Sequence, residues 1–282
     1  MKKIFIIFIA LVFYSTSVLA VEKMKFKYNF HENLPKKWVT EFNNIMNIVQ
    51  EVMPINENTN DWVKNNMKLT NMKQGYGMDI YAWKRTKNPF PEKRANMKGS
   101  CICETNSPAP WVQLDINPKD LADSRNRIRT YSVIVHEYFH VYQHHHISGK
   151  CSDDRRKKCE RDKKATGEYD KRPWFHEGGA EYSGQLLYRE TTGNKKYFFN
   201  QMKRKLKKSL NRYKSEYNMD LKSITYKKDK NIAYDIGSWF IAYLYSKEGE
   251  EKHKNNFYKD LDKLGFEGSF VKNFGKSSDE YI

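Results

Sequence analysis

The chain of 282 residues carries 51 Lys and Arg against 34 Asp and Glu, a net charge of +17, and 39% of its residues are hydrophobic. The apolar and aromatic content excludes a disordered polyelectrolyte, and the length is sufficient for one domain with a packed core. The charge favours association with anionic surfaces, although a general overuse of lysine explains it without a dedicated partner.

The first twenty residues have the pattern of a secretory signal peptide. Lys2 and Lys3 precede an apolar run over residues 4–14, and small residues lead up to Ala20. The run is too short to cross a bilayer, and no later stretch reaches about eighteen consecutive apolar residues. We therefore expect cleavage after Ala20, no transmembrane segment in the mature protein, and a secreted or periplasmic location. An uncleaved anchor is the alternative.

Four cysteines agree with an oxidising compartment. Cys101, Cys103, Cys151 and Cys159 allow two disulfide bonds. A bond between Cys151 and Cys159 would close a charged loop, but cross-pairing with the other two is an alternative. Neither spacing is the C-x-x-C of a zinc knuckle, which makes that kind of site a poorer explanation.

Three elements are predicted before residue 120. Apolar residues recur at helical spacing over 35–52, and Pro35 is suited to a first turn. Residues 78–83 have a strand pattern. Residues 111–116 alternate apolar with polar residues and form a second predicted strand.

Helical patterns dominate after residue 124. Apolar residues at three- and four-residue steps predict a helix over 124–147. Residues 148–172 are highly charged and almost without apolar residues, so we expect a surface loop. Further helices are predicted over residues 174–190, 195–213, 232–247 and 252–264.

The order of these elements predicts an α+β fold with a small mixed sheet and a mostly helical C-terminal half. We divide the chain into a signal peptide over 1–20 and an N-terminal α/β subdomain over 21–147. A charged loop over 148–172 and a helical C-terminal subdomain over 173–282 complete the expected organisation.

Residues 136–140 read His-Glu-Tyr-Phe-His inside a predicted helix. Residues four apart lie on one helix face, so His136 and His140 can bind one ion. Glu137 would stand beside that ion and accept a proton from metal-bound water. In a chain with 8 histidines, chance is a poor explanation for this H-E-x-x-H pattern. The sequence therefore predicts a zinc site.

A third ligand is needed, and two histidines are candidates. His146 occupies the place of the third histidine in the metzincin pattern, but Gln143 stands where that pattern has a turn-forming glycine. His144 fits a continuous helix, yet it would place three ligands in a row along one helix, which does not suit a tetrahedral ion.

A better candidate lies in residues 174–182, Trp-Phe-His-Glu-Gly-Gly-Ala-Glu-Tyr. This segment resembles the second ligand helix of the gluzincin metallopeptidases. The resemblance implies that Glu177 is the third zinc ligand and that Glu181 supports a ligand histidine, although the two carboxylates could exchange roles. It also implies that Gly178 and Gly179 let this helix pack close to the helix of the two histidines.

Residues 234–237, Tyr-Asp-Ile-Gly, are similar to the Y-x-x-G segment of aminopeptidase N-like gluzincins. That resemblance implies that Tyr234 stabilises the oxyanion. A tyrosine of the helical core is the alternative. The G-x-M-E-N segment by which that family grips a free amino terminus is absent before His136, so we do not predict an aminopeptidase. In zincins the substrate pairs with an edge strand before the histidine helix, and residues 111–116 occupy that place, unless they form an ordinary core strand.

Together these features predict an exported zinc metallopeptidase with a zincin-like fold, in which His136, His140 and Glu177 hold Zn²⁺ and Glu137 is the general base. We expect a peptide or protein substrate, an anionic cell-surface polymer as a further partner, and no specific nucleic acid. The alternatives are a metzincin-type peptidase that uses His146, a zinc hydrolase of another amide, and a non-catalytic cationic binding protein of the cell envelope.

Overall fold

The computed structural model describes residues 24–55, 78–86, 89–90, 100–103, 111–122, 126–146, 149–150, 160–161, 172–218 and 220–282. The predicted signal peptide lies outside these residues, as do Cys151 and Cys159, so cleavage and disulfide pairing stay predictions. Within the described residues, no helix combines the length and the apolar character that crossing a membrane requires.

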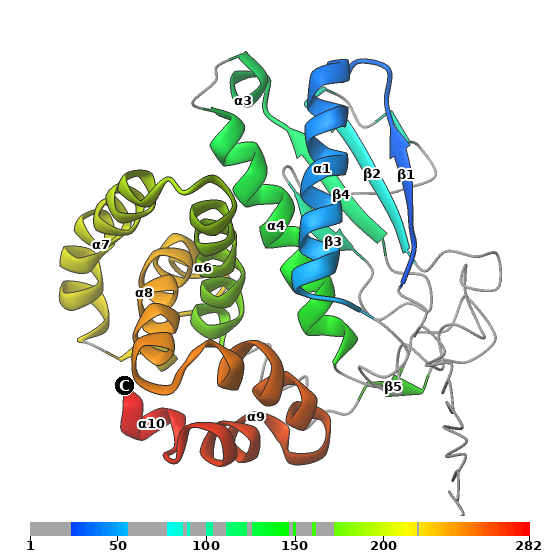
Figure 1. The fold of residues 1–282 in the computed structure, drawn as a ribbon. Helices are drawn as coiled ribbons and strands as arrows, with labels where there is room; N and C mark the ends of the chain where they lie inside the picture. Colours follow the sequence, from blue (N-terminus) through cyan, green and yellow to red (C-terminus); the bar gives the residue numbers. More distant parts are fainter. Residues whose placement is uncertain are drawn as a thin grey trace, which may run out of the picture.

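The N-terminal half contains a mixed sheet in the order β1-β2-β4-β3 (Figure 1). Its strands are β1 (Phe26–Phe30), β2 (Met78–Lys84), β3 (Cys101–Cys103) and β4 (Trp111–Ile116). Strands β1, β2 and β4 run parallel to one another, and β3 pairs antiparallel with β4. On the side of β4 away from β2, β3 pairs with Trp111, Val112 and Gln113, so the prediction that residues 111–116 offer an edge strand to a substrate is wrong for these three residues.

Successive side chains of β4 point to opposite faces of the sheet, and each face is covered by an apolar layer. Val112 and Leu114 belong to the main core, whereas Trp111 packs with Tyr81 and Trp83 in a smaller cluster on the other face. Helices α1 (Lys36–Val52) and α4 (Asn126–His145) contact each other and cover the main core face. Side chains on both faces of β4 are therefore buried.

Helices form the C-terminal half and lie on the side of α4 opposite the sheet (Figure 1). They are α6 (Pro173–Thr192), α7 (Lys195–Tyr217), α8 (Lys230–Glu248), α9 (Tyr258–Phe274) and α10 (Ser278–Tyr281), with the short α3 (Pro118–Ala122) before α4. A 3₁₀ turn, η2 (Leu221–Ser223), precedes α8, and π-helical η3 (Lys252–Phe257) precedes α9. Pro173 stands in the first turn of α6, and Gly193 ends that helix at φ 68°.

Two predicted segments contain more structure than expected. The loop expected over 148–172 includes a short antiparallel pair between β5 (Gly149–Lys150) and β6 (Glu160–Arg161). The last predicted helix begins as a π-helix, and Gly265, at φ 70°, breaks it directly after the predicted end at Leu264. A second helical segment then continues to Phe274. The other helices and strands lie within a few residues of their predicted positions.

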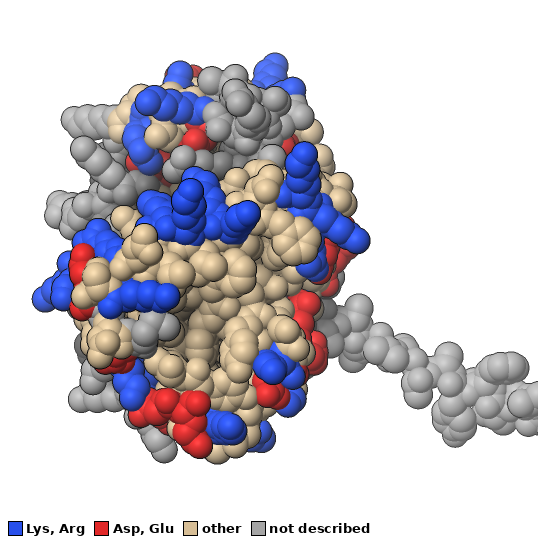
Figure 2. Space-filling view, turned by 90° about the vertical axis from the view of Figure 1, so that its left-hand side faces the viewer, with Lys and Arg blue, Asp and Glu red and all other residues tan. Residues whose placement is uncertain are grey.

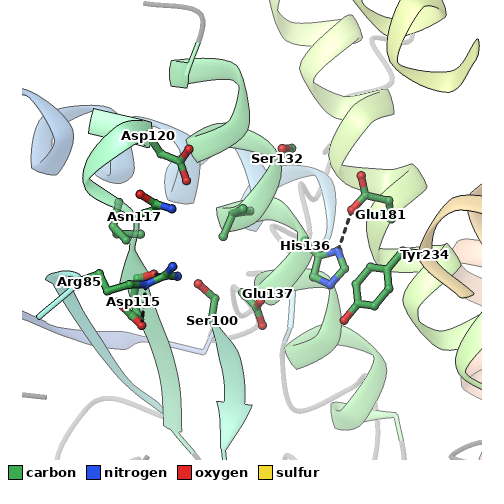
Figure 3. A pocket seen from close by; sticks show the side chains of 12 residues that line it. Arg85, Ser100, Asp115, Asn117, Asp120, Ser132, His136, Glu137, Glu181 and Tyr234 are labelled. Atoms are coloured by element: carbon green, nitrogen blue, oxygen red, sulfur yellow. Dashed lines mark hydrogen bonds and ion pairs between the residues drawn. The ribbon is translucent and has the colours of Figure 1, made fainter. Parts of the chain in front are cut away.

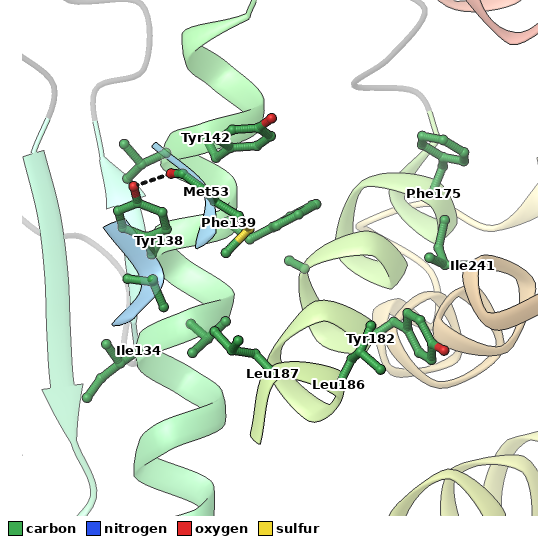
Figure 4. Close-up of a cluster of buried hydrophobic side chains, with 14 of the residues drawn as sticks. Met53, Ile134, Tyr138, Phe139, Tyr142, Phe175, Tyr182, Leu186, Leu187 and Ile241 are labelled. Carbon is green, nitrogen blue, oxygen red and sulfur yellow. Dashed lines mark hydrogen bonds between the residues drawn. The ribbon is translucent and has the colours of Figure 1, made fainter. Parts of the chain in front are cut away.

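One hydrophobic core extends through both halves, with α4 at its centre (Figure 4). Ile134 and Tyr138 point from α4 toward the sheet, and Tyr138 donates a hydrogen bond to the Met53 carbonyl at 2.6 Å. Phe139 and Tyr142 point from the opposite side toward the C-terminal helices. Since α4 is packed on two sides, its polar histidines are held in a rigid and largely dry environment.

Candidate metal centre

Three ligand atoms from two helices converge on one point. His136 Nε2 lies 3.0 Å from His140 Nε2, and Glu177 Oε2 lies 3.2 Å from the first and 3.1 Å from the second. All three side chains are buried. Among the described residues, this is the one group of three or more His, Cys, Asp or Glu residues whose ligand atoms converge in this way.

This arrangement fits a metal ion. Ligands about 2.0–2.1 Å from a tetrahedral ion lie roughly 3.3 Å from one another, close to the three distances found here. Two imidazole nitrogens and one carboxylate oxygen are also donors that divalent transition metals accept. The cluster can therefore hold a metal ion with three protein ligands and one position left for another molecule.

The helix that carries Glu177 approaches α4 closely because glycines line the contact. A Cβ atom on Gly179 would lie 3.3 Å from Phe139 and 3.2 Å from Gln143, and one on Gly184 would lie 2.8 Å from the Ser132 carbonyl oxygen. The prediction for Gly179 is confirmed, since larger side chains at these contacts would push α6 away from the two histidines.

Gly178 does not face the histidine helix, so that part of the prediction is wrong. A Cβ atom on Gly178 would lie 2.4 Å from the carbonyl carbon of Gly237 on α8. The two glycines of the two motifs therefore meet, and they let α6 and α8 cross at backbone contact.

Gln143 orients His140, a role that sequence reasoning missed. His140 Nδ1 donates to Gln143 Oε1 at 2.7 Å, which leaves Nε2 free of that proton and directed at the cluster. Gln143 Nε2 in turn donates to the His176 carbonyl at 3.1 Å and to the Tyr258 hydroxyl at 3.0 Å. The available signal was its position three residues after His140, on the same helix face.

Glu181 supports the other histidine and is not part of the converging group. Its Oε2 lies 3.6 Å from His136 Nδ1, and its Oε1 pairs with Lys205 Nζ at 2.8 Å. The structure thus separates the two carboxylates that the sequence left interchangeable: Glu177 faces Nε2 of both histidines, and Glu181 faces the distal nitrogen of one.

The charges of the cluster attract a cation. Burial alone would lower the pKa of His136, but the hydrogen bonds and charges of Glu177, Glu181 and Glu137 raise it to about 10. Burial opposes ionisation of Glu177 as well, yet the two histidines hold the pKa of its carboxyl well below the usual range. The site therefore favours a bound positive charge, whether proton or metal ion.

Glu137 lies next to the cluster and is buried. Burial raises the pKa of its carboxyl, partly offset by His136 and His140. Its Oε2 is a buried oxygen that no hydrogen-bond donor reaches within the described part of the chain. A buried carboxylate with an unused oxygen and a raised pKa is suited to accepting a proton.

Tyr234 lies against the cluster rather than in the helical core. Its ring stacks on His136 with centroids 5.6 Å apart and planes 10° from parallel, and it lines the same cavity. Burial and the carboxylate of Glu177 raise the pKa of the Tyr234 hydroxyl. The hydroxyl therefore stays protonated at neutral pH and can donate a hydrogen bond into the cavity.

The other candidate histidines do not reach the converging atoms. His146 Nδ1 bonds the Tyr142 carbonyl at 2.7 Å, and burial lowers the pKa of this imidazole to about 4. The ring of His144 packs edge-on against His176 at 5.2 Å. The helix continues to His145, so no glycine turn brings His146 back to the cluster.

A cavity of about 250 Å³ opens beside the cluster, as Figure 3 shows. His136, Glu137 and Tyr234 line one side, and the ends of two strands line the other. On that second side Arg85 Nε donates to Asp115 Oδ2 at 3.0 Å. Arg85 and Asp115 carry no motif, so sequence reasoning had no signal for them.

Comparison with protein-family models, curated proteins and solved structures gave no match. The assignment of a function therefore depends on the chemistry of the site itself.

Proposed function

We propose that this protein is an exported zinc-dependent metallopeptidase of the gluzincin type. The observation that carries the proposal is the convergence of His136 Nε2, His140 Nε2 and Glu177 Oε2 beside an open cavity. Export is inferred from the sequence pattern of residues 1–20 alone.

Zinc is the metal that we assign to this site. Two imidazoles and one carboxylate with an open fourth position are typical of catalytic zinc sites in hydrolases. When bound there, zinc would polarise a carbonyl group and lower the pKa of a coordinated water. The buried, glycine-lined contact between α4 and α6 supplies the rigid support that such a site requires.

Glu137 is the proposed general base. Its Oε2 takes a proton from the attacking water, and the resulting carboxylic acid delivers that proton to the leaving nitrogen of the peptide bond. Burial favours the protonated carboxyl that this second step needs. The position directly after His136 on α4 keeps the carboxyl beside the reacting atoms.

Tyr234 is the proposed oxyanion donor. A tyrosine hydroxyl is protonated at neutral pH, and burial raises the pKa of this one further. It can donate to the substrate oxygen as negative charge develops there, which lowers the barrier more than it strengthens substrate binding. Stacking on His136 keeps the ring next to the cluster.

Metal analysis of the purified protein, combined with digestion of a peptide library with and without chelator, tests the proposal. We expect about one zinc per chain and peptide cleavage that stops on chelation and returns with zinc. A protein that binds no metal, or one whose peptide cleavage survives complete metal removal, would contradict it.

The charge also supports an anionic polymer as a further partner. Exposed basic side chains cover α7, and Figure 2 shows Lys and Arg gathered on the face where this helix lies. They are Lys195, Lys196, Lys203, Arg204, Lys207, Lys208 and Lys214. The one acidic residue of α7, Glu216, pairs with Arg212 at 3.0 Å and so leaves this face strongly positive.

Retention on immobilised heparin in a salt gradient tests this second partner. We expect a variant with Lys203→Gln, Lys207→Gln and Lys208→Gln to elute at clearly lower salt than the unchanged protein. A matched variant with the ion-paired residues changed, Lys252→Gln, Lys254→Gln and Lys272→Gln, should elute later than the α7 variant. Equal elution of both variants would show that total charge, and not the α7 face, governs binding.

A further inference from the structure

Three charged side chains from three helices form a chain behind the metal-binding cluster. Glu181 of α6 pairs with Lys205 of α7 at 2.8 Å, and Lys205 Nζ also lies 3.1 Å from Asp235 Oδ1 of α8. Asp235 Oδ2 accepts a hydrogen bond from Ser209 at 2.8 Å. The side chain of Lys205 is only 11% exposed, so the charge chain is shielded from solvent and salt.

This row of charged side chains leads from Asp235 through Lys205 and Glu181 to the metal ligand His136. While Glu181 Oε1 contacts Lys205, its Oε2 lies 3.6 Å from His136 Nδ1. A carboxylate at this place keeps the imidazole proton on Nδ1 and the lone pair of Nε2 directed at the cluster. The ion pair between Glu181 Oε1 and Lys205 fixes the orientation in which Oε2 faces Nδ1.

We propose that Lys205 and Asp235 are positioning residues for the metal ligand His136. Asp235 holds the Lys205 ammonium in place, and that ammonium holds the Glu181 carboxylate in position beside Nδ1. The inference rests on the proposed function only in that the cluster must bind zinc. It does not depend on which bond the enzyme hydrolyses.

A purely structural role makes a different prediction. If the charges only clamped α7 to α6 and α8, replacing Lys205 would change the free energy of unfolding but leave the zinc affinity of the folded protein unchanged. If Lys205 acts through Glu181, its loss weakens zinc binding, and that loss disappears once Glu181 has been replaced.

The experiment is a double-mutant cycle in zinc affinity, measured by competition with a chromogenic chelator. It compares the full-length protein with Lys205→Met, Glu181→Gln and the double variant, with folding checked by circular dichroism. We expect Lys205→Met and Glu181→Gln each to weaken zinc binding about tenfold or more. The double variant should bind no more weakly than Glu181→Gln. Lys263→Met, an exposed change on α9, serves as control and should match the unchanged protein.

Asp235→Asn is the second variant, for use if Lys205→Met does not fold. It should weaken zinc binding several-fold, and only when Glu181 is present. A folded Lys205→Met variant with zinc affinity within about twofold of the unchanged protein, or additive effects in the cycle, would overturn the inference alone. Failure of the unchanged protein to bind zinc would overturn the proposed function as well.

Discussion

Gly178 of α6 and Gly237 of α8 meet at backbone contact, and this contact places two motifs beside one cavity. A Cβ atom on Gly237 would lie 1.9 Å from the Trp174 carbonyl oxygen and 3.1 Å from the Gly178 Cα. Gly237 follows Tyr234 by three residues on the same helix, so the crossing holds the Tyr234 ring against His136. The glycine of the Y-x-x-G segment thus has a packing role: it permits the close crossing of α6 and α8 that positions the tyrosine beside His136.

Replacing Gly237 with alanine should separate the two helices. The new methyl group would overlap a backbone oxygen that cannot rotate away, so we expect a loss of about 3 kcal/mol or more in the free energy of unfolding. Urea denaturation measures it. Gly193→Ala is the control, since its Cβ meets nothing within 4 Å and only the left-handed φ of 68° opposes it, at about 1 kcal/mol. Equal losses in both variants would contradict the close crossing.

Glu137→Gln should retain zinc and lose activity. The amide keeps the shape of the side chain but accepts no proton at neutral pH, so we expect kcat to fall at least about 100-fold. Zinc content and peptide hydrolysis, measured on the same preparation, provide the check. The control is Glu250→Gln, which removes the carboxylate of a partly exposed ion pair with Lys254. It should leave zinc content and peptide hydrolysis unchanged. Full activity in Glu137→Gln would show that the Glu137 carboxylate is not the general base.

Replacing the proposed third ligand distinguishes the gluzincin type from the metzincin type, the two kinds of peptidase that the sequence suggests. Glu177→Ala removes a converging oxygen and should reduce zinc content to near background after dialysis. His146→Ala should retain zinc, because this imidazole bonds the Tyr142 carbonyl instead of the cluster. Elemental analysis of both variants decides between them. Retention of zinc by Glu177→Ala together with loss by His146→Ala would favour the metzincin alternative.

The buried imidazole of His253 should make the protein less stable in mild acid. Burial lowers its pKa to about 3, below the value near 6.5 of an unfolded chain. The unfolded state therefore binds a proton that the folded state does not, and the free energy of unfolding falls as pH decreases from about 6.5 toward 3. This histidine contributes about 1.4 kcal/mol per pH unit to that fall.

Urea denaturation between pH 6.5 and 4.5 measures the effect. His253→Gln keeps a polar group near the Tyr245 and Tyr258 hydroxyls, which lie 3.2 and 3.4 Å from the imidazole, but it does not titrate. The variant should therefore lose less stability over this pH interval than the unchanged protein. Identical pH slopes would show that His253 is protonated in the folded state.

Local patterns predicted the elements that carry the chemistry. The four-residue step between His136 and His140 requires only a helix, and apolar spacing along the same segment predicts that helix. The carboxylate of Glu177 was named from a resemblance to a ligand segment, and the structure brings its Oε2 to the two imidazoles. These predictions succeeded because helix geometry relates sequence spacing directly to position on a face.

Long-range pairing was not determined by the sequence. Residues 111–116 have the alternation of an exposed edge, yet β2 pairs along one side of β4 and β3 pairs with Trp111, Val112 and Gln113 on the other. The direction that each glycine of α6 faces followed from helix crossings that no local pattern describes. Lys205, which belongs to no motif, and Asp235, a position that the Y-x-x-G pattern leaves unspecified, joined the site only when three helices packed together.

The net charge of +17 and the H-E-x-x-H pattern follow from the sequence alone, and with them the expectation of a metal-dependent hydrolase. Tertiary structure decided which carboxylate completes the ligand group and which residues orient the imidazoles. It also decided which side chains face them across a cavity. The reason is physical: a ligand is defined by the distance between atoms a few ångströms apart, and helix crossings far apart in the chain set that distance.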